Sequence, residues 1–168
     1  MRGMARNGES ETDRALSQIP GGLFIMTTCH EGLRGAVMIR WAQQCSDTPP
    51  MVMVALPKGQ SVEPLIHGSR SFVLCQISAD DRFLIRKFSH VHDNGEDPLV
   101  TMMTTTAPSG SPIVDRALTY MDCEVVRHIE LDSDYRIYVV QVHCSAVLNQ
   151  GAPAVCFGGN GFESNGAK

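Results

Sequence analysis

The fold of this chain is decided by one stretch, Arg40-Trp41-Ala42-Gln43-Gln44-Cys45-Ser46-Asp47-Thr48-Pro49-Pro50-Met51-Val52-Met53-Val54-Ala55-Leu56. It predicts a strand, a corner at the two prolines and a second, apolar strand. Proline lacks a backbone N–H and has a fixed φ, so a proline pair cannot lie inside a sheet. The polar turn Lys58-Gly59-Gln60-Ser61 follows, before a predicted short helix. Two strands joined at a corner, beside a helix start and a cation, can hold a phosphorylated cofactor.

Short apolar runs separated by polar turns continue on both sides of this stretch. Strands are expected at 23–29, 35–44, 51–56, 71–78, 117–130 and 135–148, with a last short strand at 154–157. Helices are expected at 12–19, 62–67 and 80–88, with Thr12 and Ser61 as N-caps. The continuous apolar character of 51–56 predicts burial on both faces. Because strands and helices do not alternate, the pattern favours a mainly β fold, an antiparallel barrel or sandwich of six or seven strands with two or three short helices.

Composition narrows the classes of function. The chain has 168 residues, enough for one domain, and its net charge of −4 argues against nucleic acid as the main partner. Six cysteines without a CxxC pair predict reduced thiols, no zinc site and a cytoplasmic protein. The polar start of the chain predicts no signal peptide, and the lack of a long apolar run predicts no membrane span. No Rossmann glycine motif or P-loop occurs.

An ordered series of short motifs resembles a known family. The pattern S-W-x-x-Q-x-S, followed by P-P, is matched at Trp41, Gln44, Ser46 and Pro49-Pro50, with Arg40 in place of the first Ser. The later matches are Lys58, Glu63-Pro64-Leu65, Phe72-Val73-Leu74, Arg86-Lys87-Phe88, Gly110-Ser111-Pro112-Ile113-Val114 and Ala117-Leu118-Thr119-Tyr120-Met121-Asp122-Cys123. Together they resemble the flavin-reductase-like, FMN-binding split barrels, and most closely the flavin reductase module of flavodiiron proteins.

The resemblance implies a fold, a cofactor and a function. It implies a Greek-key split barrel over residues 19–162, preceded by a tail and short helix at 1–18 and followed by a tail at 163–168. It implies bound FMN near the interface of a homodimer, reduction by NADH or NADPH, and electron transfer to a partner protein. Two alternatives remain: an FMN electron carrier reduced by a partner protein, without nicotinamide chemistry, and a relative of the barrel that binds haem or a pyridoxal-type ligand. No residue specifically favours the latter.

The same resemblance implies the site residues. The expected flavin contacts are Met38, Arg40, Trp41, Ala42, Gln43, Gln44 and Ala55, and the expected phosphate contacts are Lys58, Gln60, Ser61 and Val62, with Arg86 as a second candidate cation. Alternation in one strand puts Met38, Arg40, Ala42 and Gln44 on a shared face. Arg40 is then expected to stabilise the anionic reduced flavin, or to point at the phosphate or solvent. Trp41, on the other face, is either a cofactor contact or a packed core residue.

The C-terminal segment departs from the family pattern. Active members carry a G-N-H-Y-like segment there, thought to assist nicotinamide binding, whereas this chain has Gly159-Asn160-Gly161-Phe162. Gly161 at the place of the family's histidine weakens the case for efficient nicotinamide use and supports the carrier. The hydride chemistry belongs to the flavin, so no catalytic side chain is expected. His90-x-His92-Asp93 offers too few ligands, and no metal site is expected.

Overall fold

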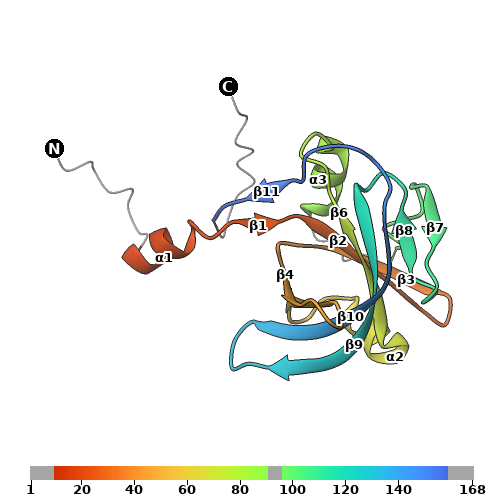
Figure 1. Cartoon of the computed structure of the whole chain (residues 1–168), viewed down its shortest axis with the longest axis horizontal. Coiled ribbons are helices and arrows are strands. Elements are labelled where there is room, and N and C mark those ends of the chain that lie inside the picture. The colour runs from red at the N-terminus through yellow and green to blue at the C-terminus, as the bar shows by residue number, and fades with distance from the viewer. Residues whose placement is uncertain (1–9, 91–95, 159–168) are drawn as a thin grey trace.

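A curled, seven-stranded antiparallel sheet organises the chain in the computed structural model, which describes residues 10–90 and 96–158 (Figure 1). The strand order is β3-β2-β6-β9-β10-β5-β4. The strands of the sheet are β2 (Phe24–His30), β3 (Leu33–Ile39), β4 (Trp41–Ser46), β5 (Met51–Pro57), β6 (Ser71–Gln76), β9 (Thr119–Glu130) and β10 (Tyr135–Val147). The smaller elements are the ribbon of β1 (Gly21–Gly22) and β11 (Val155–Cys156), the ribbon of β7 (Thr104–Thr106) and β8 (Pro112–Val114), and the helices α1 (Glu11–Leu16), α2 (Glu63–Ser69) and α3 (Arg82–Phe88). The expected mainly β fold with two or three short helices is confirmed.

The sheet is split between β3 and β4. These strands follow one another in the chain, yet β3 pairs with β2 at one edge of the sheet and β4 pairs with β5 at the other. The expectation of one continuous strand at 35–44 is therefore wrong, because the chain crosses from edge to edge at Arg40. The sheet curls until its two edges are joined through that residue, and no ladder between β3 and β4 closes the barrel.

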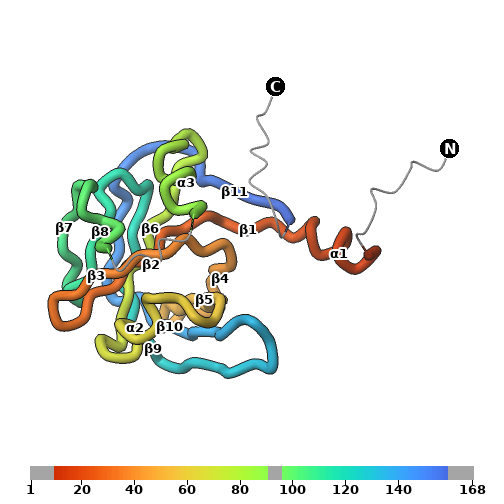
Figure 2. The backbone as a smooth tube through the Cα atoms, turned by 180° about the vertical axis from the view of Figure 1, so that it is seen from behind, coloured from red at the N-terminus to blue at the C-terminus, as the bar shows by residue number. Residues whose placement is uncertain are grey.

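Two apolar cores lie on the two faces of this sheet. The interior core, inside the curl, contains Phe24, Met26, Ile39, Val52, Val54, Leu56, Val62, Ile66, Phe72, Leu74, Cys123, Val125, Tyr138 and Val140. The second core lies on the outer face of β2 and β6, beneath α3, the β7–β8 ribbon and β11; its members are Leu23, Ile25, Val73, Cys75, Ile77, Leu84, Phe88, Leu99, Ala107, Ile113, Val114, Ala117, Ala154 and Cys156. Seen from behind, the β7–β8 ribbon lies on the side away from the tip of the β9–β10 hairpin (Figure 2).

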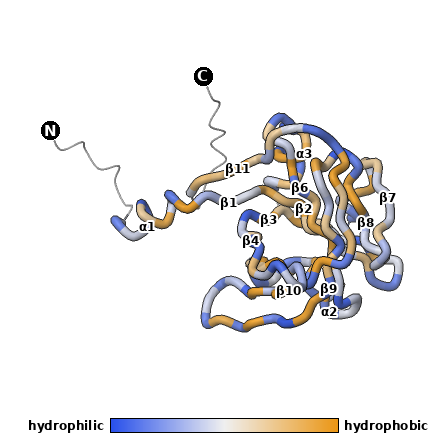
Figure 3. The backbone as a smooth tube through the Cα atoms, in the orientation of Figure 1, coloured by the Kyte–Doolittle hydropathy of each residue, from blue (hydrophilic) through white to orange (hydrophobic). Residues whose placement is uncertain are grey.

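The outer face of the other half of the sheet has no such cover among the described residues. Strand β5 alternates between the buried Val52, Val54 and Leu56 and the exposed Met53, so burial on both faces is not observed. The register aligns Met53 with Val139 of β10, and the neighbouring β9–β10 hairpin carries apolar stretches of its own (Figure 3).

Local chemistry explains the helix boundaries. Ser10, not Thr12, caps α1, through a reciprocal pair of hydrogen bonds with Asp13. Val62, not Ser61, is the N-cap of α2, and no side-chain hydrogen bond caps this helix. Asp81 caps α3 by accepting from the backbone N–H of Leu84 at 3.1 Å. None of the helices in the described ranges is long and apolar enough to cross a membrane.

Candidate functional site

The break at Arg40 and the turn after β5 lie at the same end of the sheet. Trp41 stands opposite Ala55 in the β4–β5 ladder, so Lys58, three residues beyond Ala55, lies beside the start of β4. In the part of the chain that the structure describes, β5 is the single ladder partner of β4. The other edge of β4 therefore presents backbone N–H and C=O groups outside the sheet, as edge strands do. The corner formed by Arg40, β4 and residues 58–62 is the candidate site.

The strand break separates residues that the sequence placed together. Met38 packs against the second core, on the outer face of the sheet, whereas Ala42 packs against the interior core. The expectation that Met38, Arg40, Ala42 and Gln44 share one face is therefore wrong. Its physical reason is the crossing at Arg40: alternation along a strand holds only while the chain stays in one ladder.

Trp41 lies on the outside of the sheet. Its side chain is 45% exposed, and its ring stacks on Tyr135 of β10 at a centroid distance of 4.9 Å and an angle of 47°. A buried place in the core is thus excluded for this tryptophan. Its neighbours along β4, Gln43 and Gln44, are also exposed. Gln44 donates through Nε2 to Asp47 at 2.9 Å, which fixes it to the corner that precedes β5.

Lys58 holds the tip of the β9–β10 hairpin. Its Nζ donates to the carbonyl of Leu131 at 2.8 Å and lies 3.6 Å from Glu130, and its backbone N–H donates to the carbonyl of Asp134 at 2.8 Å. Gly59 follows with φ of +85°, in the left-handed region that favours glycine. The ammonium group of Lys58 thus lies at the corner, in contact with the hairpin.

The remaining residues of the turn differ in their hydrogen bonds and in their burial. The backbone N–H of Gln60 donates to Glu63 Oε1 at 3.0 Å. Ser61 is exposed, and Val62 is completely buried in the interior core. Of the four expected phosphate contacts, Lys58 and Ser61 are thus exposed, Gln60 is half-buried and Val62 is buried.

Arg136 is a cation of this corner that the sequence did not single out. It stands opposite Leu56 in the β5–β10 ladder and pairs with both Glu63 of α2 and Glu130 of β9. The hydrogen bond from Arg136 lowers the pKa of Glu130 below its ordinary value, and burial opposes this. Lys58 and Arg136 thus share Glu130. Only the long-range pairing of β10 with β5 reveals this, because nothing near Arg136 in the sequence points to Lys58.

The second candidate cation, Arg86, lies on a different helix from the one that follows the turn at 58–62. Arg86 lies in the last turn of α3, which packs on the second core. Helices α2 and α3 are at opposite ends of the sheet in both views (Figures 1 and 2). Gly161 lies outside the described residues, as do His92 and Asp93 of the His90 motif. Among residues 10–90 and 96–158, no three His, Cys, Asp or Glu side chains form a group that would hold a metal.

All six cysteines are free thiols. Cys75, Cys123 and Cys156 are buried, Cys29 and Cys144 are half-buried, and Cys45 is exposed. Burial raises the pKa of Cys75 and of Cys123 to about 12. These two thiols are neutral at physiological pH, and they serve as packing groups.

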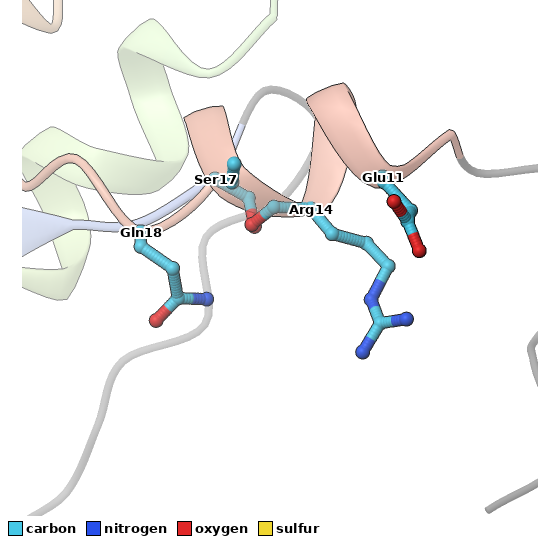
Figure 4. A pocket seen from close by; sticks show the side chains of 5 residues that line it. Glu11, Arg14, Ser17 and Gln18 are labelled. Carbon is cyan, nitrogen blue, oxygen red and sulfur yellow. The ribbon is translucent and has the colours of Figure 1, made fainter.

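An open hollow of about 580 Å³ lies beside α1 (Figure 4). It is lined by Glu11, Arg14, Ala15, Ser17 and Gln18. All five residues belong to α1 or to the two positions after it, and none belongs to the corner around Arg40. We assign no function to this hollow.

Comparison with known families identifies the class of this domain. Residues 16–163 match the family model described as flavin reductase like domain. The chain is 30% identical over 148 residues to diflavin flavoprotein A 1 of Synechocystis, and 31% identical over 131 residues to the putative diflavin flavoprotein A 1 of Thermosynechococcus vestitus. These alignments cover 88% and 77% of this chain but 26% and 23% of the relatives, so the chain spans about a quarter of their length.

Solved structures share the fold. The NADH:FAD oxidoreductase SgcE6 of Streptomyces globisporus superposes with a TM-score of 0.80 at 18% identity, over 94% of this chain and 96% of that one. The flavin reductase PheA2 gives a TM-score of 0.75 at 18% identity, over 89% and 94% of the two chains. The split barrel is therefore the fold of this chain, and the chain belongs to the flavin reductase like domain family.

Proposed function

We propose that this chain binds FMN at the corner around Arg40 and uses it to pass electrons from NADH or NADPH to an acceptor. The family supports a flavin-related oxidoreductase, and the choice of FMN and of a nicotinamide donor is our inference. One observation carries it: β4 has an unpaired edge that begins at the strand break, and the cations Lys58 and Arg136 lie at the same end of the sheet.

The residues at the corner fit such a cofactor. A flavin needs hydrogen-bond partners along its pyrimidine edge, and the backbone of an edge strand supplies both donors and acceptors. Its phosphate needs positive charge, which Lys58 and Arg136 provide next to Gly59, where a glycine lets the backbone approach closely. Both cations contact Glu130 in this structure, so a phosphate has to compete with that carboxylate.

Bound FMN supplies the hydride and electron chemistry, and the protein supplies position and charge. In this proposal the backbone of β4 orients the ring system, and Lys58 and Arg136 hold the phosphate. The stacked pair of the exposed Trp41 and the half-buried Tyr135 lies at the start of β4, on the outer face of the sheet.

The favoured assembly is a homodimer with the site near its interface. Trp41, Met53 and Ile129 are 45%, 41% and 40% exposed on the outer face of the uncovered half of the sheet. Apolar side chains gathered on one sheet face are stabilised when a second surface covers them. Because β4 belongs to this half, a second copy placed there would lie beside the flavin. A redox partner protein then receives the electrons.

The second candidate is an FMN electron carrier that a partner protein reduces. The sequence feature that favours it is Gly161, which stands where the family pattern that this chain resembles has a histidine. Such a carrier needs the same flavin corner but no nicotinamide pocket.

Anaerobic titration tests the proposal. Purified protein is titrated with FMN, FAD and riboflavin, followed by flavin absorbance and fluorescence, and the FMN-loaded protein is then mixed with NADH or NADPH. We expect FMN to bind most tightly and NADH or NADPH to bleach the flavin rapidly. FMN binding without bleaching selects the carrier. Absence of any flavin binding contradicts both functions.

A further inference from the structure

The short ribbon of β1 and β11, called the clasp below, joins the two ends of the described domain. Gly21 stands opposite Cys156 and Gly22 opposite Val155. The backbone N–H of Leu23 donates to the carbonyl of Ala154 at 3.0 Å, and Cys156 Sγ lies 3.4 Å from the carbonyl of Gly21. A ribbon of two residues per strand is weak by itself, so other contacts must hold it in place.

The clasp rests on the strand break at Arg40. A Cβ atom added to Gly21 would lie 2.6 Å from the carbonyl oxygen of Arg40, a distance that real Cβ atoms do not reach. The two backbones are therefore in direct contact, and glycine is the residue that permits it. The clasp thus crosses the molecule at the point where β3 ends and β4 begins.

The side chain of Arg40 contacts the same clasp from its other end. Nη1 of Arg40 donates to the carbonyl of Gly158 at 3.5 Å, two residues beyond β11. Its charge also acts on Cys156: burial raises the pKa of this thiol, and the nearby guanidinium opposes that rise. Arg40 therefore contacts β1 through its backbone and the chain after β11 through its side chain.

We propose that Arg40 is a positioning residue that holds the clasp, and the chain at Gly158, against the strand break. The functional consequence rests on the flavin proposed at this corner: because the clasp lies directly on the strand break, its position affects access to a flavin bound there. A guanidinium suits this role because it presents several donors in a fixed plane, whereas a lysine offers a single flexible charge.

The thiol of Cys156 reports whether the clasp is closed. The side chain is 4% exposed, and a thiol must be both accessible and deprotonated to react. We expect Arg40→Ser to raise the rate of Cys156 alkylation by iodoacetamide about tenfold or more, because the clasp opens locally without global unfolding. Loss of the guanidinium by itself acts the other way, because it removes the charge that opposes the rise of this thiol's pKa, so a faster reaction reports opening of the clasp. Cys75 and Cys123, which are 0% and 1% exposed, should remain unreactive. Peptide mass spectrometry separates the three sites.

Two further variants sharpen the test. Arg40→Lys should restore part of the protection, because it keeps the charge but not the planar donors. Arg116→Ser is the matched control: Arg116 pairs with Asp81 at 2.9 Å, outside the clasp, and its loss should leave Cys156 protected. With saturating FMN, Arg40→Ser should raise the KM for the nicotinamide more than it changes kcat.

Either of two results overturns the role of Arg40. The first is that Cys156 reacts as slowly in Arg40→Ser as in the wild type. The second is that all three buried thiols become reactive together, which would show that Arg40 stabilises the whole fold. The labelling experiment needs no cofactor. If the chain fails to bind flavin, the proposed function falls, while the selective labelling of Cys156 still decides whether Arg40 holds the clasp.

Discussion

Trp41 of β4 and Tyr135 of β10 stack at 4.9 Å although β5 lies between their strands. Ala55 of β5 stands opposite Trp41 and Pro57 stands opposite Tyr135, so the two rings meet diagonally across β5. The pair lies on the same outer face as Met53, and this half of the sheet has no cover among the described residues. An aromatic pair of this kind stabilises by about 0.5–1.5 kcal/mol beyond the area that it buries.

This uncovered face leads to a prediction about assembly. We expect a dimer at micromolar concentration, and Met53→Lys should make the protein monomeric, because a charge in an apolar interface loses its water without gaining a partner. Light scattering gives the mass, and circular dichroism checks that the variant is folded. Met103→Lys is the control, since Met103 is 79% exposed in the segment before β7. A wild-type monomer, or a Met53→Lys dimer of unchanged affinity, would contradict this interface.

The two candidate phosphate cations should behave differently. Lys58→Met should weaken FMN binding by about tenfold or more, because a charge-assisted hydrogen bond to the phosphate is lost, and should leave riboflavin binding nearly unchanged. Arg86→Met should affect neither ligand, since α3 lies at the other end of the sheet from α2 (Figure 1). Fluorescence titration measures both affinities. Equal losses for FMN and riboflavin in Lys58→Met would place this lysine away from the phosphate.

The close approach of Gly21 to the carbonyl of Arg40 should make the free energy of unfolding sensitive to a side chain at position 21. Gly21→Ala forces a Cβ against the carbonyl of Arg40, and we expect a loss of about 1–3 kcal/mol, as for other overpacked sites. Gly22→Ala is the control, because its Cβ would meet the ring of Phe24 at 3.0 Å, and a side chain can move aside more easily than a backbone. Urea unfolding measures both variants. If Gly21→Ala costs no more than Gly22→Ala, the clasp does not press on the strand break.

The buried thiol of Cys75 should make the free energy of unfolding depend on pH in the alkaline range. Burial raises its pKa from 9.0 to about 12. Above pH 9 the unfolded chain releases this proton while the native chain retains it, so the free energy of unfolding falls between pH 9 and 12, at most by about 1.4 kcal/mol per pH unit. Below pH 9 this thiol contributes no pH dependence.

Urea unfolding at pH 7.5, 9.0 and 10.5 tests this slope. Cys75→Ala should flatten the alkaline part of the curve relative to the wild type, whereas Cys45→Ala, which removes an exposed thiol, should not. Parallel curves for the wild type and Cys75→Ala would show that the native protein does not protect this thiol from ionising.

The tail supplies a last prediction, although Gly161 lies outside the described residues. If Gly161 occupies the place of the family's histidine, Gly161→His should raise nicotinamide turnover and leave FMN affinity nearly unchanged. A ring at this position would stack on or hydrogen-bond to the nicotinamide and restrict it to reactive orientations. Stopped-flow reduction with NADH and NADPH measures the effect. Loss of FMN, or unchanged rates with both donors, would remove the tail from the hydride site and remove the main support for the carrier.

Much of the architecture was predictable because its causes are local. Alternation and apolar runs placed most of the strands, and Pro49-Pro50 placed the corner between β4 and β5. The burial of β5 was not predictable in the same way. Its run from Met51 to Leu56 is apolar throughout, but whether a face is covered depends on elements distant in sequence, and here one face of β5 carries the exposed Met53.

The candidate site likewise has parts that the sequence predicted and parts that only the structure revealed. Its position at the strand that ends in Pro49-Pro50, and the lysine after β5, came from the ordered motifs of the sequence. The break at Arg40 did not, because residues 35–44 contain no glycine or proline after Gly35 to mark an interruption, and only the curvature of the whole sheet separates the two strands. Nor did Arg136, whose place beside Lys58 depends on the register of β10 with β5.

The sequence by itself therefore determined the mainly β class, the order of the strands along the chain and the family, since strand propensity, turn chemistry and motif spacing act over a few residues. The tertiary structure alone decided which edges meet, which charges pair and what covers the strand break. Cys156 and Gly21 are 135 residues apart and lie 3.4 Å from one another, Sγ to carbonyl oxygen. Such a contact follows from how the entire sheet curls and packs, and no local pattern encodes it.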